Sequence, residues 1–247
     1  MPPRKPEHNA LATMYRMSRR LLRPVKALSK TMTILLFGEL HDYLSRCRGV
    51  IHVGANVGQE RDLYADRGLS VLWIEPIPSV FAKLIDNIGE EPKQRAINAL
   101  LLDKDDVEQV FHVASNDGAS SSIFDFHMHG DIWPEISYVG DLTMRSSTLP
   151  SVLKREGVEL SEYDALVLDT QGSELLVLRG AEQILGGFRY VQTEAADFES
   201  YRDGALASEI MSFMKGHGFV LRYRQQMARH RSGGTYYELL FKNRNLR

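Results

Sequence analysis

A turn with two glycines follows the first buried strand that the sequence predicts, over residues 50–53. Gly54 and Gly58 flank Asn56 in this turn. A glycine turn between a parallel strand and its helix lets a ligand approach the backbone at the edge where such sheets bind ligands. The dinucleotide fingerprint needs glycine where this chain has Asn56 and Gln59, and the P-loop needs Gly-Lys-Ser/Thr. The turn therefore indicates a ligand without pyrophosphate; a tight turn that binds nothing is the alternative.

An acidic residue, Glu75, ends the next predicted strand (residues 70–75), 21 positions after Gly54. In nucleoside-binding α/β folds a carboxylate at this place accepts hydrogen bonds from both ribose hydroxyls. The alternative is a surface carboxylate that caps the helix predicted from Ser79. The glycine turn, the spaced acid and the missing pyrophosphate glycine together favour a nucleoside ligand such as S-adenosylmethionine.

Two more carboxylates stand at predicted strand ends, Asp169 on strand 165–169 and Glu194 after strand 190–193. Methyl transfer from a sulfonium needs in-line positioning and a base for the acceptor hydroxyl. Asp169 can orient the acceptor, take its proton or bind a divalent cation, and Glu194 occupies the matching position on the following strand. Helix capping by Asp169, and the ordinary placement of polar residues at strand ends for Glu194, are the structural alternatives.

The segment 114–147 is long, rich in Ser, Gly, Asp and His, and has no clear hydrophobic period. Segments of this kind are more often functional than idle. His127, His129 and Asp131 are spaced two apart, and Trp133 can stack on a sugar face. We weigh three interpretations: a polar-acceptor site with His127 among its catalytic residues, a metal site, for which the third nitrogen ligand is missing, and a solvated loop. We assign no metal site.

Strands and helices alternate from Arg48 onward. Besides the strands named above, the sequence predicts strands at 96–102, 107–113, 219–223 and 236–242, and helices at 59–67, 79–88, 148–155, 173–185 and 206–217. Strands separated by helices imply right-handed crossovers and a parallel sheet covered on both faces. The last two strands have no helix between them, so they are expected to pair antiparallel.

The composition is that of an ordinary globular protein: 247 residues, 43% hydrophobic and 25% charged, with one cysteine. A disulfide framework within the chain and a multi-cysteine metal site are thereby excluded. Residues 1–30 carry eight Lys or Arg against one Glu, a net charge of +7 that leaves −9 on the rest of the chain. So acidic a body argues against nucleic acid as a partner, because duplex binding depends on neutralising phosphates.

The basic segment also shows apolar residues at helical spacing, with Pro24 as a break. An amphipathic helix that packs on the main domain, a contact with a membrane surface or a partner, and a transit segment all fit this pattern. No apolar run reaches the length of a membrane span. We therefore expect a cytoplasmic protein, with peripheral membrane contact through this arm as an option.

Four ordered segments resemble the FkbM family of methyltransferases. They are Val50–Gln59, Trp73–Pro76, Leu168–Ala181 and Gln192–Glu194, and the similarity extends over residues 48–242. The resemblance implies a Rossmann-like α/β methyltransferase fold, with a mostly parallel seven-stranded sheet, an antiparallel last strand and helices on both faces. It also implies S-adenosylmethionine as cofactor and an O-methylated hydroxyl of a sugar, glycolipid or natural product.

The resemblance also implies roles for particular residues. Gly54, Ala55, Asn56 and Gly58 would line the methionine end of the cofactor, Glu75 would hold the ribose, and Ile77 would pack against the adenine. Ala99 and Leu100, with Asn98, lie where the adenine edge is read. His52 stands where the family has Asp, and a His cannot accept hydrogen bonds from loop amides in the manner of a carboxylate.

We thus expect a basic arm at residues 1–47 and a methyltransferase domain at 48–247, acting on a small-molecule or glycan acceptor. A divalent cation is an option that the residues do not argue for. The alternatives are a non-catalytic methyltransferase-like binding module and a nucleotide-sugar or NAD-dependent enzyme. The retained Gly54, Gly58, Glu75 and Asp169 favour the methyltransferase.

Overall fold

The computed structural model describes residues 39–231 and 233–246. The basic segment 1–30 lies outside the described residues, so its helix stays a prediction. Tyr43–Arg247 form one compact unit of the chain. The division into arm and domain after residue 47 likewise stays a prediction.

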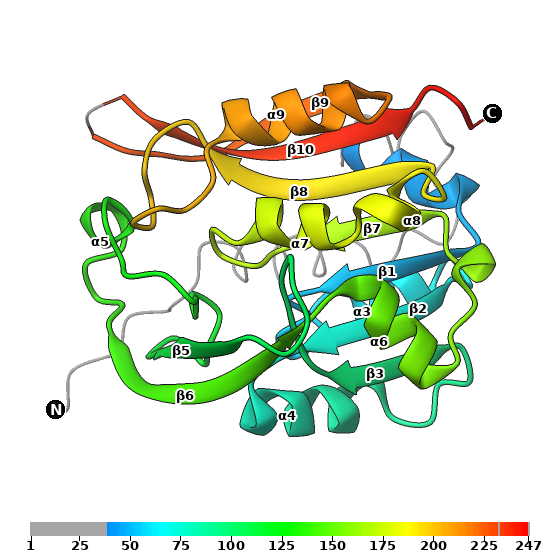
Figure 1. Cartoon of the computed structure of the whole chain (residues 1–247), viewed down its shortest axis with the longest axis horizontal. Coiled ribbons are helices and arrows are strands. Elements are labelled where there is room, and N and C mark those ends of the chain that lie inside the picture. The colour runs from blue at the N-terminus through cyan, green and yellow to red at the C-terminus, as the bar shows by residue number, and fades with distance from the viewer. Residues whose placement is uncertain (1–38, 232, 247) are drawn as a thin grey trace, which may run out of the picture. The chain divides into compact units, whose positions relative to one another are not determined.

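Seven strands form the large sheet of this unit, in the order β3-β2-β1-β7-β8-β10-β9 (Figure 1). Their bounds are β1 Gly49–Val53, β2 Ser70–Glu75, β3 Gln94–Asn98, β7 Ala165–Leu168, β8 Tyr190–Ala196, β9 Phe219–Arg229 and β10 Thr235–Asn243. Parallel pairing joins β3, β2, β1, β7 and β8. Strand β10 runs antiparallel to both β8 and β9. The predicted mostly parallel sheet with an antiparallel last strand is confirmed.

Helices cover both faces of the sheet. Their bounds are η1 Glu39–Arg46, α3 Arg61–Ala65, α4 Pro78–Ile88, α5 His129–Ile132, α6 Leu149–Glu156, η2 Leu160–Glu162, α7 Glu174–Gly180, α8 Glu182–Leu185 and α9 Ala207–Gly216. Helix α6 shows why these segments start and stop where they do. Thr148 accepts a hydrogen bond from the Ser151 amide at its start, and Gly157 ends it in the left-handed conformation.

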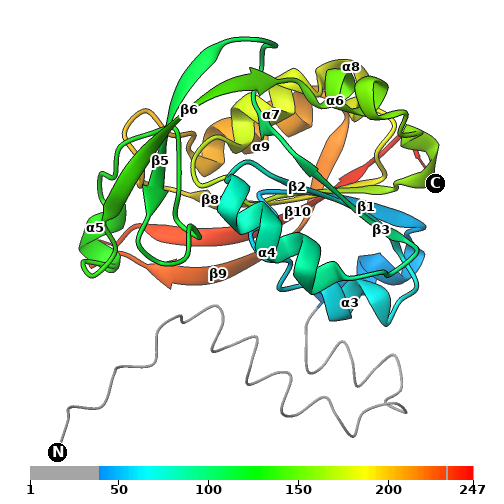
Figure 2. The ribbon, with the colours of Figure 1, turned by 90° about the horizontal axis from the view of Figure 1, so that it is seen from below.

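Side chains on the central strands alternate between two cores. Ile51, Leu72 and Leu166 belong to the larger apolar cluster, which includes residues of α6, α7, α8 and α9. Figure 2 shows these four helices together on one side of the sheet and α3 on the other. On the α3 side, Tyr64 lies 5.3 Å from Trp73 between ring centroids. Because both faces are buried, the strand ends are the places where the sheet can present polar groups to a ligand.

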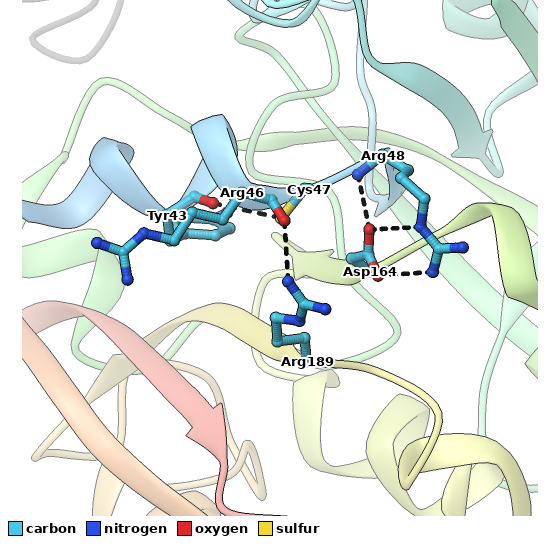
Figure 3. Close-up of polar contacts among 6 residues, drawn as sticks. All are labelled: Tyr43, Arg46, Cys47, Arg48, Asp164 and Arg189. Carbon is cyan, nitrogen blue, oxygen red and sulfur yellow. Dashed lines mark hydrogen bonds and ion pairs between the residues drawn. The ribbon is translucent and has the colours of Figure 1, made fainter. Parts of the chain in front are cut away.

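An ion pair joins the amino ends of β1 and β7 (Figure 3). The Asp164 carboxylate accepts hydrogen bonds from the Arg48 backbone amide at 2.6 Å, from Nε at 3.0 Å and from Nη2 at 2.8 Å. These bonds hold the pKa of Asp164 below its usual range. Beside this pair, Arg189 donates to the Arg46 carbonyl at 3.2 Å. The amino edge of the sheet therefore carries a carboxylate whose charge is compensated.

A second, three-stranded sheet, in the order β4-β6-β5, was not expected from the sequence. It consists of β4 Leu100–Leu101, β5 Glu108–Ala114 and β6 Tyr138–Ser147. No strand was predicted within residues 114–147, where the structure has β6. Its alternation is short: Leu142 and Met144 pack against a buried apolar cluster and alternate with the exposed Thr143 and Arg145, whereas residues 139–141 are all exposed. The apolar run 96–102 likewise divides between β3 and β4, and Figure 1 shows β5, β6 and α5 beyond the carboxyl ends of the parallel strands.

Among the described residues, none of the helices combines the length and the apolar character that a membrane crossing would require.

Candidate active site

The glycine turn lies at the carboxyl end of β1 and bonds to the neighbouring strand. The backbone amides of Gly54 and Ala55 donate to the Ile74 carbonyl at 2.9 and 3.0 Å. Gly54 has φ +78°, and a Cβ there would lie 1.8 Å from the Asp169 carbonyl oxygen. Glycine is thus required because the chain leaving β7 passes directly over the turn. Asn56, with φ 46°, is in the left-handed region without being glycine, a strained conformation of the kind that gathers at functional sites.

Glu75 ends β2 and closes the same turn. Its side chain is buried, with Oε2 accepting from the Asn56 amide at 2.8 Å and Oε1 from the Ile77 amide at 2.9 Å. Burial raises its pKa to about 7, against the effect of these two bonds. Each carboxylate oxygen can accept one more hydrogen bond. Asn98 donates to the carbonyls of Glu75 and Pro76, at 2.8 and 2.9 Å, and so fixes the end of β2.

Asp169 follows β7, on the other side of β1 from Glu75. Gln171 Nε2 donates to Asp169 Oδ1 at 2.5 Å, and the Tyr201 hydroxyl donates to Gln171 Oε1 at 2.6 Å. Gln171 is another non-glycine residue with positive φ, 53°. Burial raises the pKa of Asp169 to about 6. Gln171 therefore orients the carboxyl group through Oδ1 and leaves Oδ2 for another partner.

Glu174, which the sequence analysis did not select, closes the loop after Asp169. Its carboxylate accepts from the Thr170 amide at 2.8 Å and from the Gly172 amide at 3.0 Å. Burial raises its pKa to about 7, and the charge of Asp169 adds to the effect. The carboxylate that ties this loop to the start of α7 is thus Glu174. Its position in the first turn of a predicted helix was the available signal.

Glu194 lies in β8 directly opposite Glu238 of β10. Burial, followed by the charges of Asp169 and Glu238, raises the pKa of Glu194 well above its ordinary value. Burial also raises the pKa of Glu238 to about 7. Two carboxyl groups side by side cannot both ionise cheaply, so the pair retains a proton at neutral pH. Glu238 was missed because a strand face can be assigned only when the pairing register is known.

The residues expected at the adenine take two different positions. Ile77 and Leu100 are buried in one apolar cluster with Val80 and Phe111. Ala99 is partly buried and packs against the main core. A Cβ on Gly118 would lie 2.9 Å from Ile77 Cδ1, so the loop after β5 lies close over this cluster. Ile77 and Leu100 thus meet at the end of β2, next to Glu75, and Ala99 turns away from them.

The side chain of His52, in β1, lies on the α3 side of the sheet. Its ring stacks on Trp73 at 5.2 Å, and Nδ1 lies 3.1 Å from the Tyr64 hydroxyl. Burial lowers its pKa to about 3, so the ring is neutral. His52, at the position where the resemblance implies Asp, therefore joins an aromatic cluster beneath α3.

His127, His129 and Asp131, the three residues selected in segment 114–147, contact different parts of the protein. His127 Nδ1 lies 3.0 Å from the Glu199 carbonyl oxygen, which pairs it with the β8–α9 connection. His129 is buried and stacks on Phe126 with centroids 4.5 Å apart. Asp131 Oδ2 lies 3.2 Å from His230 Nε2. Within the described ranges, groups of three or more His, Cys, Asp or Glu suited to a metal are not found.

The fold is that of an α/β protein with a mostly parallel sheet, and carboxylates gather at the carboxyl edge of this sheet. The description "Methyltransferase FkbM domain" applies to the family model that matches residues 52–221, well over half of the sequence. The chain belongs to this family, and the predicted Rossmann-like methyltransferase fold is confirmed. No curated protein matches the sequence.

Solved structures that are similar to this chain have low sequence identity to it. Magnesium protoporphyrin IX methyltransferase (ChlM) from Synechocystis PCC 6803 with bound SAH is 9% identical, with coverage of 97% of this chain and 89% of that chain and a TM-score of 0.47. M. capricolum TrmK in complex with S-adenosyl-homocysteine is 6% identical, with coverage of 83% and 67% and a TM-score of 0.47. At this level of similarity, the assignment rests on the family match.

Proposed function

We propose that the chain transfers the methyl group of S-adenosylmethionine to a hydroxyl of a sugar, glycolipid or natural product. The observation that carries the proposal is the placement of Glu75 and Asp169 at the carboxyl ends of β2 and β7, on either side of the glycine turn of β1. Parallel α/β sheets bind ligands at the carboxyl ends of their strands, so methyl donor and acceptor would meet at this edge.

The residues at the carboxyl edge have chemical groups that suit S-adenosylmethionine. Glu75 retains acceptor capacity for the ribose hydroxyls after its two backbone bonds. Gly54, Ala55, Asn56 and Gly58 would face the methionine end, with Ile77 and Leu100 as apolar surface for the adenine. When bound, S-adenosylmethionine supplies an activated methyl group on a sulfonium. The protein's remaining task is to orient the acceptor and remove its proton.

Asp169 is the residue suited to act as the base. Burial raises its pKa to about 6, close to neutral pH. A pKa near the working pH suits a general base. The charges of Asp169 and Glu238 raise the pKa of Glu194 further. This carboxyl group is therefore better suited to donate a hydrogen bond than to act as a base. We therefore assign proton removal to Asp169 and acceptor binding to Glu194; His127 keeps a predicted role as an acceptor contact.

The experiment supplies methyl-labelled S-adenosylmethionine and a metabolite extract from a strain that lacks the gene. Mass spectrometry follows the label. The proposal predicts one extract species that gains a labelled methyl on oxygen, in the presence of a chelator as well as in its absence. Label on nitrogen or carbon would contradict the hydroxyl acceptor. Binding of NAD or a nucleotide sugar in place of S-adenosylmethionine would contradict the methyltransferase itself.

A further inference from the structure

A chain of three side chains links the β8–α9 connection to the proposed base. The Tyr201 hydroxyl donates to Gln171 Oε1 at 2.6 Å, and Gln171 Nε2 donates to Asp169 Oδ1 at 2.5 Å. The amide of Gln171 thus stands between a tyrosine and a carboxyl group. Its effect on Asp169 depends on which end of the amide faces the carboxyl group.

The amide of Gln171 can face Asp169 in two ways. With its NH2 group toward Asp169 it donates a hydrogen bond, which suits the ionised form, because a carboxylate can only accept. With its carbonyl oxygen toward Asp169 it accepts a hydrogen bond, which suits the protonated acid. The orientation of this amide and the protonation of Asp169 are therefore coupled.

Tyr201 favours the first of these two orientations. Only 3% of this residue is exposed, and burial raises its pKa well above the ordinary value, so the hydroxyl keeps its hydrogen. A phenol has one hydrogen to donate. The Ser120 carbonyl oxygen lies 3.4 Å from the hydroxyl, whereas Gln171 Oε1 lies at 2.6 Å, so the amide oxygen is the better acceptor. With its oxygen bonded to Tyr201, the Gln171 amide directs its NH2 group to Asp169.

The fold holds both Tyr201 and Gln171 in place. The ring of Tyr201 lies 5.2 Å from that of His129, between centroids, and a Cβ on Gly172 would lie 3.2 Å from Tyr201 Cβ. The backbone carbonyl of Gln171 accepts a hydrogen bond from the buried Ser122 hydroxyl at 2.7 Å. The segment that carries Ser122 and His129 is thereby tied to the loop that bears the proposed base.

The other surroundings of Asp169 favour its protonated form. Burial raises the pKa of Asp169, and the hydrogen bond from Gln171 lowers it. The titratable groups of the described residues that interact with its charge come from several elements: Glu75 at the end of β2, Glu174 of α7, Glu194 of β8, Tyr236 and Glu238 of β10, and Tyr201. All of them are acids, and negative charges close together disfavour ionisation. The NH2 group of Gln171 therefore opposes protonation of the base.

We propose that Tyr201 is a positioning residue: its bond to the Gln171 carbonyl directs the amide NH2 group to Asp169 and keeps the base in its ionised form. The assignment of Asp169 as the base rests on the proposed function. The proposal adds two residues that act on this base, Gln171 by direct contact and Tyr201 through Gln171.

The test follows the ionisation of Asp169 in the full chain by carbon-13 NMR, with aspartate labelled at the carboxyl carbon. The Asp169 signal is the one that Asp169→Asn removes. Gln171→Met, which lacks the donor, should raise the pKa of Asp169 by about 1–2 pH units, the effect of one lost charge-assisted hydrogen bond. Tyr201→Phe keeps the ring and should raise the pKa by roughly 0.5 pH unit, because the amide is then free to turn over.

A double variant shows whether Tyr201 acts through Gln171. If it does, adding Tyr201→Phe to Gln171→Met should leave the pKa of Asp169 at the value of the single Gln171→Met variant. The matched control is Tyr236→Phe. Tyr236 is also buried and interacts with the charge of Asp169, but its hydroxyl makes no hydrogen bond within the described part of the chain. Loss of this hydroxyl should leave the pKa of Asp169 unchanged.

Three results would overturn the positioning role. They are an unchanged pKa of Asp169 in either Gln171→Met or Tyr201→Phe, equal shifts in Tyr201→Phe and Tyr236→Phe, or a Tyr201→Phe shift that persists in the Gln171→Met background. The titration uses neither cofactor nor acceptor, so its outcome is independent of the methyltransferase reaction. If the pKa shifts as expected but the labelled extract assay shows no methyl transfer, the positioning role stands and the proposed reaction fails. If methyl is transferred and Tyr201→Phe leaves the pKa unchanged, the positioning role fails alone.

Discussion

The two edges of the large sheet treat buried carboxylates in opposite ways. At the amino edge, Asp164 is held by three hydrogen bonds from Arg48, and its pKa is lowered. At the carboxyl edge, burial raises the pKa values of Glu75, Asp169 and Glu174 to between about 6 and 7. At the amino edge, where Arg48 compensates its charge, the carboxylate of Asp164 has a structural role.

We infer from this difference in carboxylate pKa values that the functional site lies at the carboxyl edge. An uncompensated buried carboxylate costs folding free energy, so such groups gather where function requires them. Among the residues that the structure describes, Glu75 and Asp169 receive hydrogen bonds only from neutral amides. A sulfonium cofactor and a hydroxyl acceptor would supply the missing positive charge and the missing donor. We therefore expect ligands to bind at the carboxyl edge of the sheet and not at its amino edge.

The largest expected effect comes from removing the charge of Asp169. Asp169→Asn keeps the shape of the side chain and should lower methyl transfer by about 10²- to 10⁴-fold, the usual contribution of a general base. Cofactor binding should be nearly unchanged, because Asp169 acts on the acceptor. Labelled methyl transfer and calorimetry measure the two effects. Near-normal turnover in this variant would remove Asp169 from the mechanism.

At the amino edge, Asp164→Asn should change stability and leave chemistry intact. The Asn side chain loses charge-assisted bonds to Arg48, and we expect a loss of about 1–3 kcal/mol in the free energy of unfolding. Urea denaturation measures it. The turnover of the folded variant should match that of the unmodified protein. A large loss of turnover without loss of stability would erase the contrast between the edges.

The pH dependence of stability should carry opposite signs at the two edges. At the carboxyl edge, the raised pKa values mean that the folded state binds protons more tightly than the unfolded state. The resulting contribution to stability is complete below the ordinary pKa values of carboxyl groups and is lost as the pH rises through about 6 to 7. Asp164 contributes above its ordinary value and loses its contribution only in acid. We expect the urea midpoint of the cofactor-free protein to be higher at pH 5.5 than at pH 7.5. Double substitution Glu75→Gln, Asp169→Asn should flatten this slope, and a midpoint that rises with pH would contradict the assignment.

The smallest expected effect concerns the basic arm. Deletion of residues 1–30 should leave a folded domain that binds S-adenosylmethionine as before, because the compact unit begins at Tyr43. Binding to anionic vesicles should fall if the arm is a membrane contact. Circular dichroism, calorimetry and vesicle sedimentation measure these outcomes. Unfolding on deletion would place the arm in the core and move the predicted domain boundary.

The sequence was sufficient for elements whose signal is local. Apolar runs predicted the parallel sheet, and the glycine turn with the acidic residue at the end of strand 70–75 predicted the position of Glu75. Groups that depend on pairing across strands were out of reach: Glu238 lies opposite Glu194 only through the register of β8 and β10. Strand β6 was missed because its alternation of buried and exposed residues is confined to a few positions around Leu142 and Met144.

The most direct test of the account is calorimetry of S-adenosylmethionine with two matched carboxylate variants, Glu75→Ala and Asp164→Asn. If the ribose hydroxyls bond to Glu75, its loss removes charge-assisted hydrogen bonds of about 1.5–3 kcal/mol. We predict that Glu75→Ala weakens binding at least tenfold, while Asp164→Asn leaves it unchanged. Equal affinity in Glu75→Ala and the unmodified protein would contradict the assignment of the carboxyl edge as the cofactor site.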